Sequence, residues 1–326
     1  MRYYILLFIL AYSINTSAQG KRIIGDYKLE VIEDIILSDY DIFTPGLPAI
    51  TSDNKLVLFD FNLYKLFVYN SDLTNYQSFG SKGRGPKEFG QIFDIDVNSK
   101  GEILLLDTSN NKIIKVDANG TFKKEIPIGS GSIRPLRFTI CDQNSIMYIL
   151  SFQNSKDGFL HQYDNDGKLK KSFSKTKIKG LEFAYHTDGR LDCDDAGNLY
   201  YATLAVNEIK KYNANGELIY NMPVFDSVPN EKITERDGKF VSLNPSATRF
   251  SGNIYYIDGK LYVSYSGEAS YSYRYIDVYN EERQEYLYSI QFPYKFQRFV
   301  ITKDKIAILR EDENEESYLT VYKYSY

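Results

Sequence analysis

The amino-acid sequence predicts an all-β protein, a six-bladed β-propeller of four-stranded antiparallel blades whose ring is closed by an N-terminal strand. Three observations predict this fold. A short apolar strand recurs six times, a further strand and turn follow most copies in phase, and the apolar strands are continuous rather than alternating. A repeat of about 40–50 residues that holds four strands is typical of a propeller blade.

One repeat is clearest, between Phe89 and Gly129. It contains four expected strands, and they cover residues 93–97, 103–107, 112–116 and 121–128. The connections between them are rich in Asn, Asp and Gly, which favour tight turns. Short strands joined by such turns form an antiparallel meander, so this unit predicts one complete blade.

The second strand of this unit has six copies along the chain. They are LVLFD at Leu56, ILLLD at Ile103, IMYIL at Ile146, LYYAT at Leu199, LYVSY at Leu261 and IAILR at Ile306. A sheet with one wet face alternates apolar and polar residues, whereas a sheet covered on both faces gives continuous apolar runs. The copies therefore indicate blades that are each packed between two neighbours.

The two ends of the repeat region complement each other. The sixth unit stops after its third strand, at Tyr326, and residues 27–37 (YKLEVIEDIIL) form a strand that belongs to no unit. If this strand pairs with the last unit, it completes the sixth blade and removes strand edges that invite aggregation. Extra residues between Val224 and Pro245 precede the fifth blade and are expected to form a surface excursion rather than a second domain.

The N-terminus resembles a secretory signal peptide. Arg2 is followed by a short apolar stretch over residues 5–14 and by small residues at 16–18. This pattern predicts a signal peptide over residues 1–18 and one mature propeller domain over residues 19–326, exported to the periplasm or the exterior. The apolar stretch is shorter than the ~20 residues that span a bilayer, so no membrane span is expected after cleavage. An uncleaved membrane anchor is the alternative.

Composition limits the partners and the cross-links. The net charge of -4 argues against a nucleic-acid partner, because nucleic acids bind to a basic face. A monomer is expected.

Cys141 and Cys193 fall at equivalent positions of neighbouring blades. Packed sheets lie about 10 Å apart, whereas a disulfide needs Cα atoms roughly 5.5 Å apart. The sequence therefore predicts two separate, buried thiols.

Residues 80–120 resemble the NHL-repeat propellers. The matching segments are GRGPKEF at 83–89, DIDV at 94–97, GEI at 101–103, Asp107, NNKI at 110–113 and DANG at 117–120. With the signal peptide, the chain is similar to exported bacterial six-bladed propellers. The resemblance implies the fold and leaves the activity open, because propellers host many unrelated functions. It also implies that any metal-dependent lyase or lactonase chemistry would lie at the central channel.

Arginines recur near the expected first strands, which ring the channel of a propeller. They are Arg137, Arg190, Arg249 and Arg298. Converging guanidinium groups would favour a carboxylate, sulfate or phosphate ligand. The alternative is that each arginine pairs with an acidic residue and braces its own blade.

Acidic residues and histidines offer a second kind of site. His186, Asp188 and Asp192 lie around the start of the fourth blade and could supply three ligands to a divalent metal ion. A solvated loop histidine is the alternative for His186, and His161 is expected in the core. Asp94 and Asp96 lie on the same side of a first strand, where polar residues are expected for structural reasons.

These features favour binding over catalysis. The sequence has no G-x-S-x-G nucleophile motif and only two histidines. No cofactor is expected, apart from a possible divalent metal ion. We expect an exported, non-catalytic binding or scaffold propeller that contacts a peptide, glycan or protein partner at the channel mouth. The alternatives are an NHL-like metal-dependent lyase or hydrolase at the central channel, or a solute sensor of the cell envelope.

Overall fold

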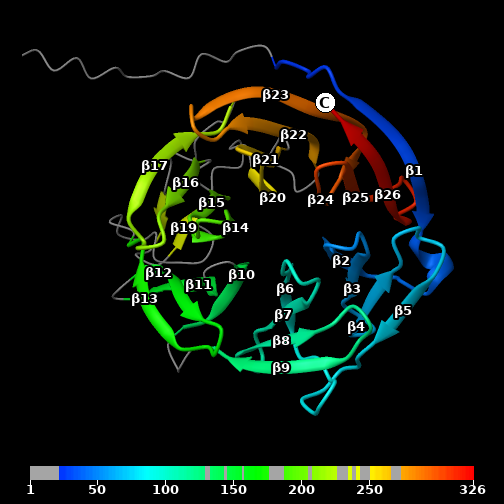
Figure 1. Ribbon diagram of the computed structural model, residues 1–326, viewed down its shortest axis with the longest axis horizontal. Helices are drawn as coiled ribbons and strands as arrows, with labels where there is room; N and C mark the ends of the chain where they lie inside the picture. Colours follow the sequence, from blue (N-terminus) through cyan, green and yellow to red (C-terminus); the bar gives the residue numbers. More distant parts are fainter. Residues whose placement is uncertain are drawn as a thin grey trace, which may run out of the picture.

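The computed structural model of the protein describes residues 22–128, 133–142, 145–155, 158–175, 187–204, 208–225, 234–236, 240–242, 250–265 and 273–326. Six four-stranded antiparallel sheets are arranged in a ring, with one strand of each sheet at the centre (Figure 1). The predicted six-bladed propeller is therefore confirmed. The predicted signal peptide lies outside the described residues.

The blades follow one another along the chain, and each of the first five runs from an innermost to an outermost strand. The first is β2 (Pro45–Ile50), β3 (Leu56–Asp60), β4 (Lys65–Tyr69) and β5 (Tyr76–Phe79). The second is β6 (Ile92–Val97), β7 (Ile103–Asp107), β8 (Lys112–Val116) and β9 (Phe122–Pro127). The third is β10 (Pro135–Cys141), β11 (Ile146–Ser155), β12 (Gly158–Asp164) and β13 (Leu169–Phe173).

The remaining blades have the same order, except that the last takes its outermost strand from the N-terminus. The fourth is β14 (Gly189–Cys193), β15 (Leu199–Thr203), β16 (Glu208–Tyr212) and β17 (Leu218–Pro223). The fifth is β20 (Phe250–Ile257), β21 (Lys260–Tyr265), β22 (Tyr273–Asn280) and β23 (Glu285–Phe296). The sixth is β24 (Arg298–Ile301), β25 (Lys305–Glu311), β26 (Ser317–Ser325) and β1 (Lys28–Ile36).

The core lies between the blades. The six predicted apolar strands are β3, β7, β11, β15, β21 and β25, each the second strand of its blade. Successive side chains of a strand point to opposite faces, so each of these strands packs against both neighbouring blades. Ile103 lies in one cluster with Val57 of the first blade, and the next residue, Leu104, lies in another with Met147 of the third.

The N-terminal strand closes the ring, as the sequence predicts. β1 pairs antiparallel with β26, from Lys28 opposite Ser325 to Ile36 opposite Tyr318, and it forms the outer edge of the sixth blade (Figure 1). The buried guanidinium of Arg310 donates to both carboxylate oxygens of Asp34, at 3.0 and 2.7 Å. Both hydrogen bonds come from Nη2, and this charge-assisted contact adds to the backbone pairing.

The residues before β1 attach to the fifth blade. Gly25 N donates to Ser289 O at 3.2 Å, and Ser289 N donates to Ile23 O at 2.7 Å. Arg22 forms an ion pair with Asp277, whose side chain is fully buried, and donates to the Ser289 hydroxyl at 2.7 Å. The beginning of the described chain therefore holds the fifth blade, and the strand that follows completes the sixth.

The prediction of two separate thiols is wrong. Cys141 ends β10, Cys193 ends β14, and the two form a disulfide with their Cα atoms 5.8 Å apart. The spacing of about 10 Å applies to sheets packed face to face. The innermost strands of neighbouring blades instead converge toward the ring axis, which brings equivalent residues within disulfide distance.

The inserted segment is described only in part. β18 (Thr234–Arg236) and β19 (Phe240–Ser242) form a two-stranded antiparallel sheet of their own, separate from the blades. The assignment of residues 19–326 to one domain stays a prediction. Within the described ranges, no helix is both long enough and apolar enough to cross a membrane.

Candidate functional site at the central channel

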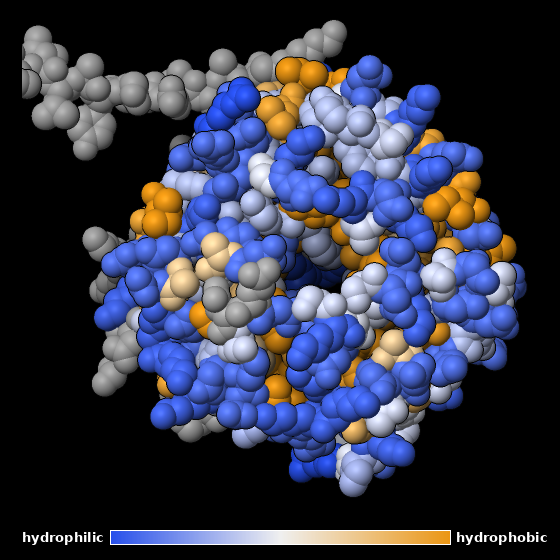
Figure 2. All heavy atoms as spheres, in the orientation of Figure 1, coloured by the Kyte–Doolittle hydropathy of each residue, from blue (hydrophilic) through white to orange (hydrophobic). Residues whose placement is uncertain are grey.

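The ring is hollow at its centre, and hydrophilic residues lie at the bottom of the hollow (Figure 2). The innermost strands supply these side chains in layers. Asp96 and Asp192 each pair with the second residue of the neighbouring strand, Leu104 or Tyr200, so they occupy equivalent positions. They form a carboxylate layer from two blades.

An arginine layer lies two residues earlier on the same set of strands. Asp94, Arg190 and Arg298 pair with Leu106, Ala202 and Leu309, which are equivalent residues of their second strands. Arg137 lies one residue closer still to the beginning of its strand. The channel therefore carries guanidinium groups toward one end and carboxylates deeper inside.

Three of the four predicted arginines share one cavity. Arg137, Arg190 and Arg298 come from three blades and line a cavity of about 400 Å³. The cavity also has aromatic walls, formed by Phe59, Phe61, Tyr64 and Phe93. Arg249 lies outside the described residues.

The ion pairs of these arginines cross between blades. Arg137 Nη2 lies 3.4 Å from Asp188 Oδ2, and Arg190 Nη1 lies 3.9 Å from Asp94 Oδ1. Arg298 donates to the Gln297 carbonyl at 3.3 Å, and no carboxylate of the described residues forms an ion pair with it. Arg137 and Arg190 therefore pair with acidic residues, as the bracing alternative expects, but these partners lie on or beside strands of other blades.

Burial and the closeness of like charges lower the pKa values of two arginines in the channel. Burial lowers the pKa of Arg298 to about 9, and the neighbouring Arg190 guanidinium lowers it further in the same direction. Burial and Arg190 also lower the pKa of Arg137. Both side chains stay protonated at neutral pH, so the cavity holds cationic groups whose mutual repulsion an anion would relieve.

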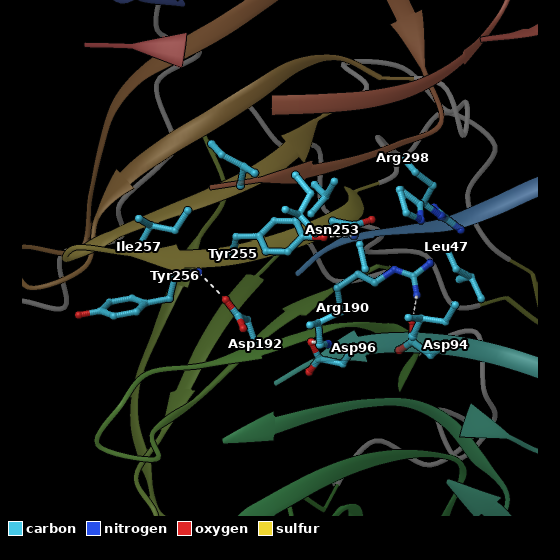
Figure 3. Close-up of a pocket in the computed structure, with 17 residues that line it drawn as sticks. Leu47, Asp94, Asp96, Arg190, Asp192, Asn253, Tyr255, Tyr256, Ile257 and Arg298 are labelled. Atoms are coloured by element: carbon cyan, nitrogen blue, oxygen red, sulfur yellow. Dashed lines mark hydrogen bonds and ion pairs between the residues drawn. The ribbon is translucent and has the colours of Figure 1, made fainter. Parts of the chain in front are cut away.

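The carboxylate layer lines a second cavity of about 250 Å³, together with Arg190, Arg298, Asn253 and Tyr255 (Figure 3). Asp96 Oδ2 accepts hydrogen bonds from Ile140 N at 2.9 Å and from Thr139 Oγ1 at 3.0 Å. Asp192 Oδ2 accepts one from Tyr256 N at 2.5 Å. Each carboxylate thus holds the innermost strand of the next blade.

Burial disfavours the charged form of these carboxylates. It raises the pKa of Asp96 to about 7 and that of Asp192 to about 8, although backbone hydrogen bonds act in the opposite direction. It also raises the pKa of Asp94, against the attraction of Arg190. The layer is therefore expected to hold protons near neutral pH.

This layer predicts a distinctive pH dependence of stability. A carboxyl group whose pKa is raised in the folded state stabilises the fold fully below its ordinary pKa of about 3.9, and this contribution is lost as pH rises through about 7 to 8. The free energy of unfolding of the wild type should therefore fall from pH 4 to 8 relative to that of an Asp96→Asn/Asp192→Asn variant. Urea denaturation across this range measures the difference, and a constant difference would contradict the prediction.

Of the three residues proposed as metal ligands, the two that the structure describes, Asp188 and Asp192, line different cavities. His186 lies outside the described residues. Asp188 pairs with Arg137 and lines a small cavity of about 60 Å³ at the arginine end, whereas Asp192 lines the larger cavity deeper inside. No group of three His, Cys, Asp or Glu residues suited to a metal ion is found among the described residues.

His161 lies in the core, as expected. Its ring nitrogens lie 2.8 Å from the Ser172 hydroxyl and 2.9 Å from the Ser151 hydroxyl, and its side chain is fully buried. Burial lowers its pKa to about 4, so it is neutral at physiological pH.

Sequence reasoning did not identify Asn253 or Tyr255, because polar and aromatic residues of innermost strands carry no motif of their own.

Solved structures of the same fold have low sequence identity to this chain. A protein of Bacteroides fragilis NCTC 9343 described as exported has a TM-score of 0.62 at 13% identity, over 92% of this chain and 95% of that one. A DUF4221 member from Bacteroides vulgatus has a TM-score of 0.60 at 11% identity, over 92% and 98%. Virginiamycin B lyase from Staphylococcus aureus has a TM-score of 0.55 at 13% identity, over 91% and 99%. At these identities the similarity concerns the fold alone.

No curated protein matches this sequence. The sequence profile of the family DUF5128, described as a 6-bladed beta-propeller, matches residues 50–302. That match covers most of the chain and all of the second to fifth blades. The chain therefore belongs to the DUF5128 family of six-bladed β-propellers.

Proposed function

We propose that this protein is an exported binding protein that holds the carboxylate of a small organic acid or of a peptide C-terminus at the arginine end of its channel. The observation that carries the proposal is the convergence of Arg137, Arg190 and Arg298 on one cavity. Guanidinium groups bind carboxylates through paired hydrogen bonds. The disulfide supports export, because such bonds persist in oxidising compartments.

The cavity walls suggest the body of the ligand. Arginines lie on one part of the wall, and Phe59, Phe61, Tyr64 and Phe93 lie on the rest. Phe61 is 41% exposed, so its ring gives the cavity wall an accessible apolar surface. Binding cavities typically combine apolar walls with a few polar groups that orient the ligand. A carboxylate that has an aliphatic or aromatic group close to it fits this combination, because that group can face the aromatic wall.

The arginines also have unused hydrogen-bonding capacity. Arg137 Nε is buried and has no hydrogen-bond partner among the residues that the structure describes. Arg298 makes no ion pair with a carboxylate of the described residues. A buried donor without a partner costs roughly 1–3 kcal/mol. A carboxylate ligand would accept such hydrogen bonds and reduce the repulsion among the guanidinium groups.

Replacing Arg298 with glutamine is expected to lower the affinity for a monocarboxylate such as pentanoate or phenylacetate by about 10- to 100-fold. The loss corresponds to one charge-assisted hydrogen-bonded contact, about 1.5–3 kcal/mol. Isothermal titration calorimetry on the mature chain measures it. Arg283→Gln is the matched control, because the Arg283 side chain is 70% exposed and pairs with Glu285. Equal affinities of the two variants would overturn the proposal.

The same titrations separate binding from the alternative of an NHL-like metal-dependent lyase or hydrolase. They are repeated after treatment with a chelator, and the purified protein is analysed for metal. The proposal expects carboxylate affinity to be unchanged by the chelator. A stoichiometric divalent ion that depends on His186, and whose removal abolishes binding, would favour the lyase or hydrolase instead.

A further inference from the structure

Groups of opposite charge share the 250 Å³ cavity. Arg190 and Arg298 line it from the arginine layer, and Asp96 and Asp192 line it from the carboxylate layer two residues deeper (Figure 3). A strand rises by about 3.3 Å per residue, so the two layers lie roughly 6–7 Å apart along the strands. Asp94 also lines the cavity from the arginine layer, 3.9 Å from Arg190 Nη1, so that end holds two guanidinium groups and one carboxyl group. The arginine end is therefore the more cationic, and the layer of Asp96 and Asp192 is acidic.

Within the described ranges, no cationic side chain pairs with the carboxylate layer. Among the described residues, Asp94 pairs with Arg190, but no lysine or arginine pairs with Asp96 or Asp192. Their hydrogen-bond donors include backbone N–H groups and the Thr139 hydroxyl. A buried carboxylate is costly unless a positive charge or a proton neutralises it.

The same cavity also contains a buried amide oxygen to which no described group donates. Asn253 Oδ1 is shielded from solvent and accepts no hydrogen bond from the part of the chain that the structure describes, although the amide nitrogen of Asn253 donates to the Tyr255 hydroxyl at 2.8 Å. Asn253 lines the cavity with the two aspartates. Buried acceptors are normally satisfied, so a ligand that brings a donor into this cavity would give the oxygen its hydrogen bond.

We infer that the ligand is a zwitterion of dipeptide or ω-amino acid size, whose carboxylate binds Arg190 and Arg298 and whose ammonium binds Asp96 and Asp192, near Asn253. The inference rests on the proposed function and names its ligand class. The ammonium supplies donors to the carboxylates and to the amide oxygen, while the separation of the two layers selects the length of the ligand.

Three ligands that share a five-carbon chain test this inference. 5-Aminopentanoate carries both charges, pentanoate only the anion, and pentylamine only the cation. Calorimetry on the mature chain at pH 7.5 is expected to show 5-aminopentanoate binding at least about tenfold more tightly than either of the others, because a hydrogen-bonded charge contact adds that much. Glycylglycine has the same number of covalent bonds between its charges and is expected to have an affinity similar to that of 5-aminopentanoate. Glycine, whose two charges lie closer together, is expected to bind more weakly.

Variants separate the two layers. In Asp96→Asn/Asp192→Asn, the preference for 5-aminopentanoate over pentanoate is expected to shrink to about twofold or less, since the ammonium has lost its anionic partners. The readout is the ratio of two affinities in one variant, so a general loss of stability does not imitate it. A thermal unfolding curve confirms that the variant is folded.

Proton release provides an independent readout. Because burial raises the pKa of Asp96 to about 7 and of Asp192 to about 8, an ammonium that binds there must displace protons. Titrations in buffers of different ionisation enthalpy should show this release for 5-aminopentanoate and not for pentanoate.

Each outcome decides between the two proposals. Equal binding of pentanoate and 5-aminopentanoate overturns the zwitterion and keeps the carboxylate site. Tight binding of pentylamine without pentanoate overturns both, as does failure of all the ligands to bind. An unchanged preference in Asp96→Asn/Asp192→Asn overturns the role of the carboxylate layer.

Discussion

Replacing Arg22 with alanine is expected to lower the free energy of unfolding by about 3–5 kcal/mol, the usual effect of removing one partner of a buried ion pair. Arg22 pairs with the fully buried Asp277 and lies 4.5 Å from the ring centroid of Tyr275. Its loss removes a cation that offsets the burial of Asp277 and weakens the attachment of the N-terminal segment to the fifth blade. Urea denaturation of the mature chain measures the change.

Two further variants complete this test. Lys28→Ala removes an exposed cation at the beginning of β1 and should change stability by no more than about 0.5 kcal/mol. Adding Asp277→Asn to Arg22→Ala should restore part of the loss, because the buried charge is then absent. If Arg22→Ala is as stable as Lys28→Ala, the N-terminal segment does not hold the ring.

Removing the disulfide is expected to have the second largest effect. A Cys141→Ala/Cys193→Ala variant should be less stable than the oxidised wild type by about 2–4 kcal/mol, because the bridge closes a loop across 52 residues and restricts the unfolded chain. It also joins the innermost strands of the third and fourth blades. Denaturation with and without a reductant measures the effect.

The reductant supplies the control for this prediction. Reduced wild type and the double variant should have similar stability, whereas the oxidised wild type should exceed both. Equal stability of the oxidised wild type and the double variant would mean that the two cysteines are separate thiols in solution.

The fold was predictable because a propeller is built from local units. Each blade is a meander of neighbouring strands, so the apolar runs that begin near Leu56 and Ile103 mark its centre without knowledge of distant contacts. The closure by β1 followed from the missing fourth strand after Tyr326. The number of strands in the last unit was enough to predict that β1 pairs with β26.

Contacts that depend on convergence toward the axis were not predictable in the same way. The spacing of packed sheets placed Cys141 and Cys193 too far apart, because it ignores how innermost strands approach one another. The pairing of Arg22 with Asp277 joins residues far apart in sequence and has no local pattern. Such contacts require coordinates.

The candidate site was predicted in part. Arginines on expected first strands were assigned to the channel, and the structure places Arg137, Arg190 and Arg298 on one cavity. The grouping of Asp192 with His186 and Asp188 as metal ligands stays a prediction, because His186 lies outside the described residues. Sequence order alone does not show that Asp192 accepts from Tyr256 N of the next blade. The charge separation between layers depends on strand register, which becomes visible only when the pairing is known.

A crystal structure of the mature chain grown with 5-aminopentanoate tests the central claim most directly. The account predicts the ligand inside the channel, with its carboxylate within hydrogen-bonding distance of the Arg190 and Arg298 guanidinium groups. An ammonium beside Asp96 and Asp192 would add support for the zwitterion. A channel that holds only water at saturating ligand concentration, or a ligand bound only on the outer surface, would contradict the carboxylate site.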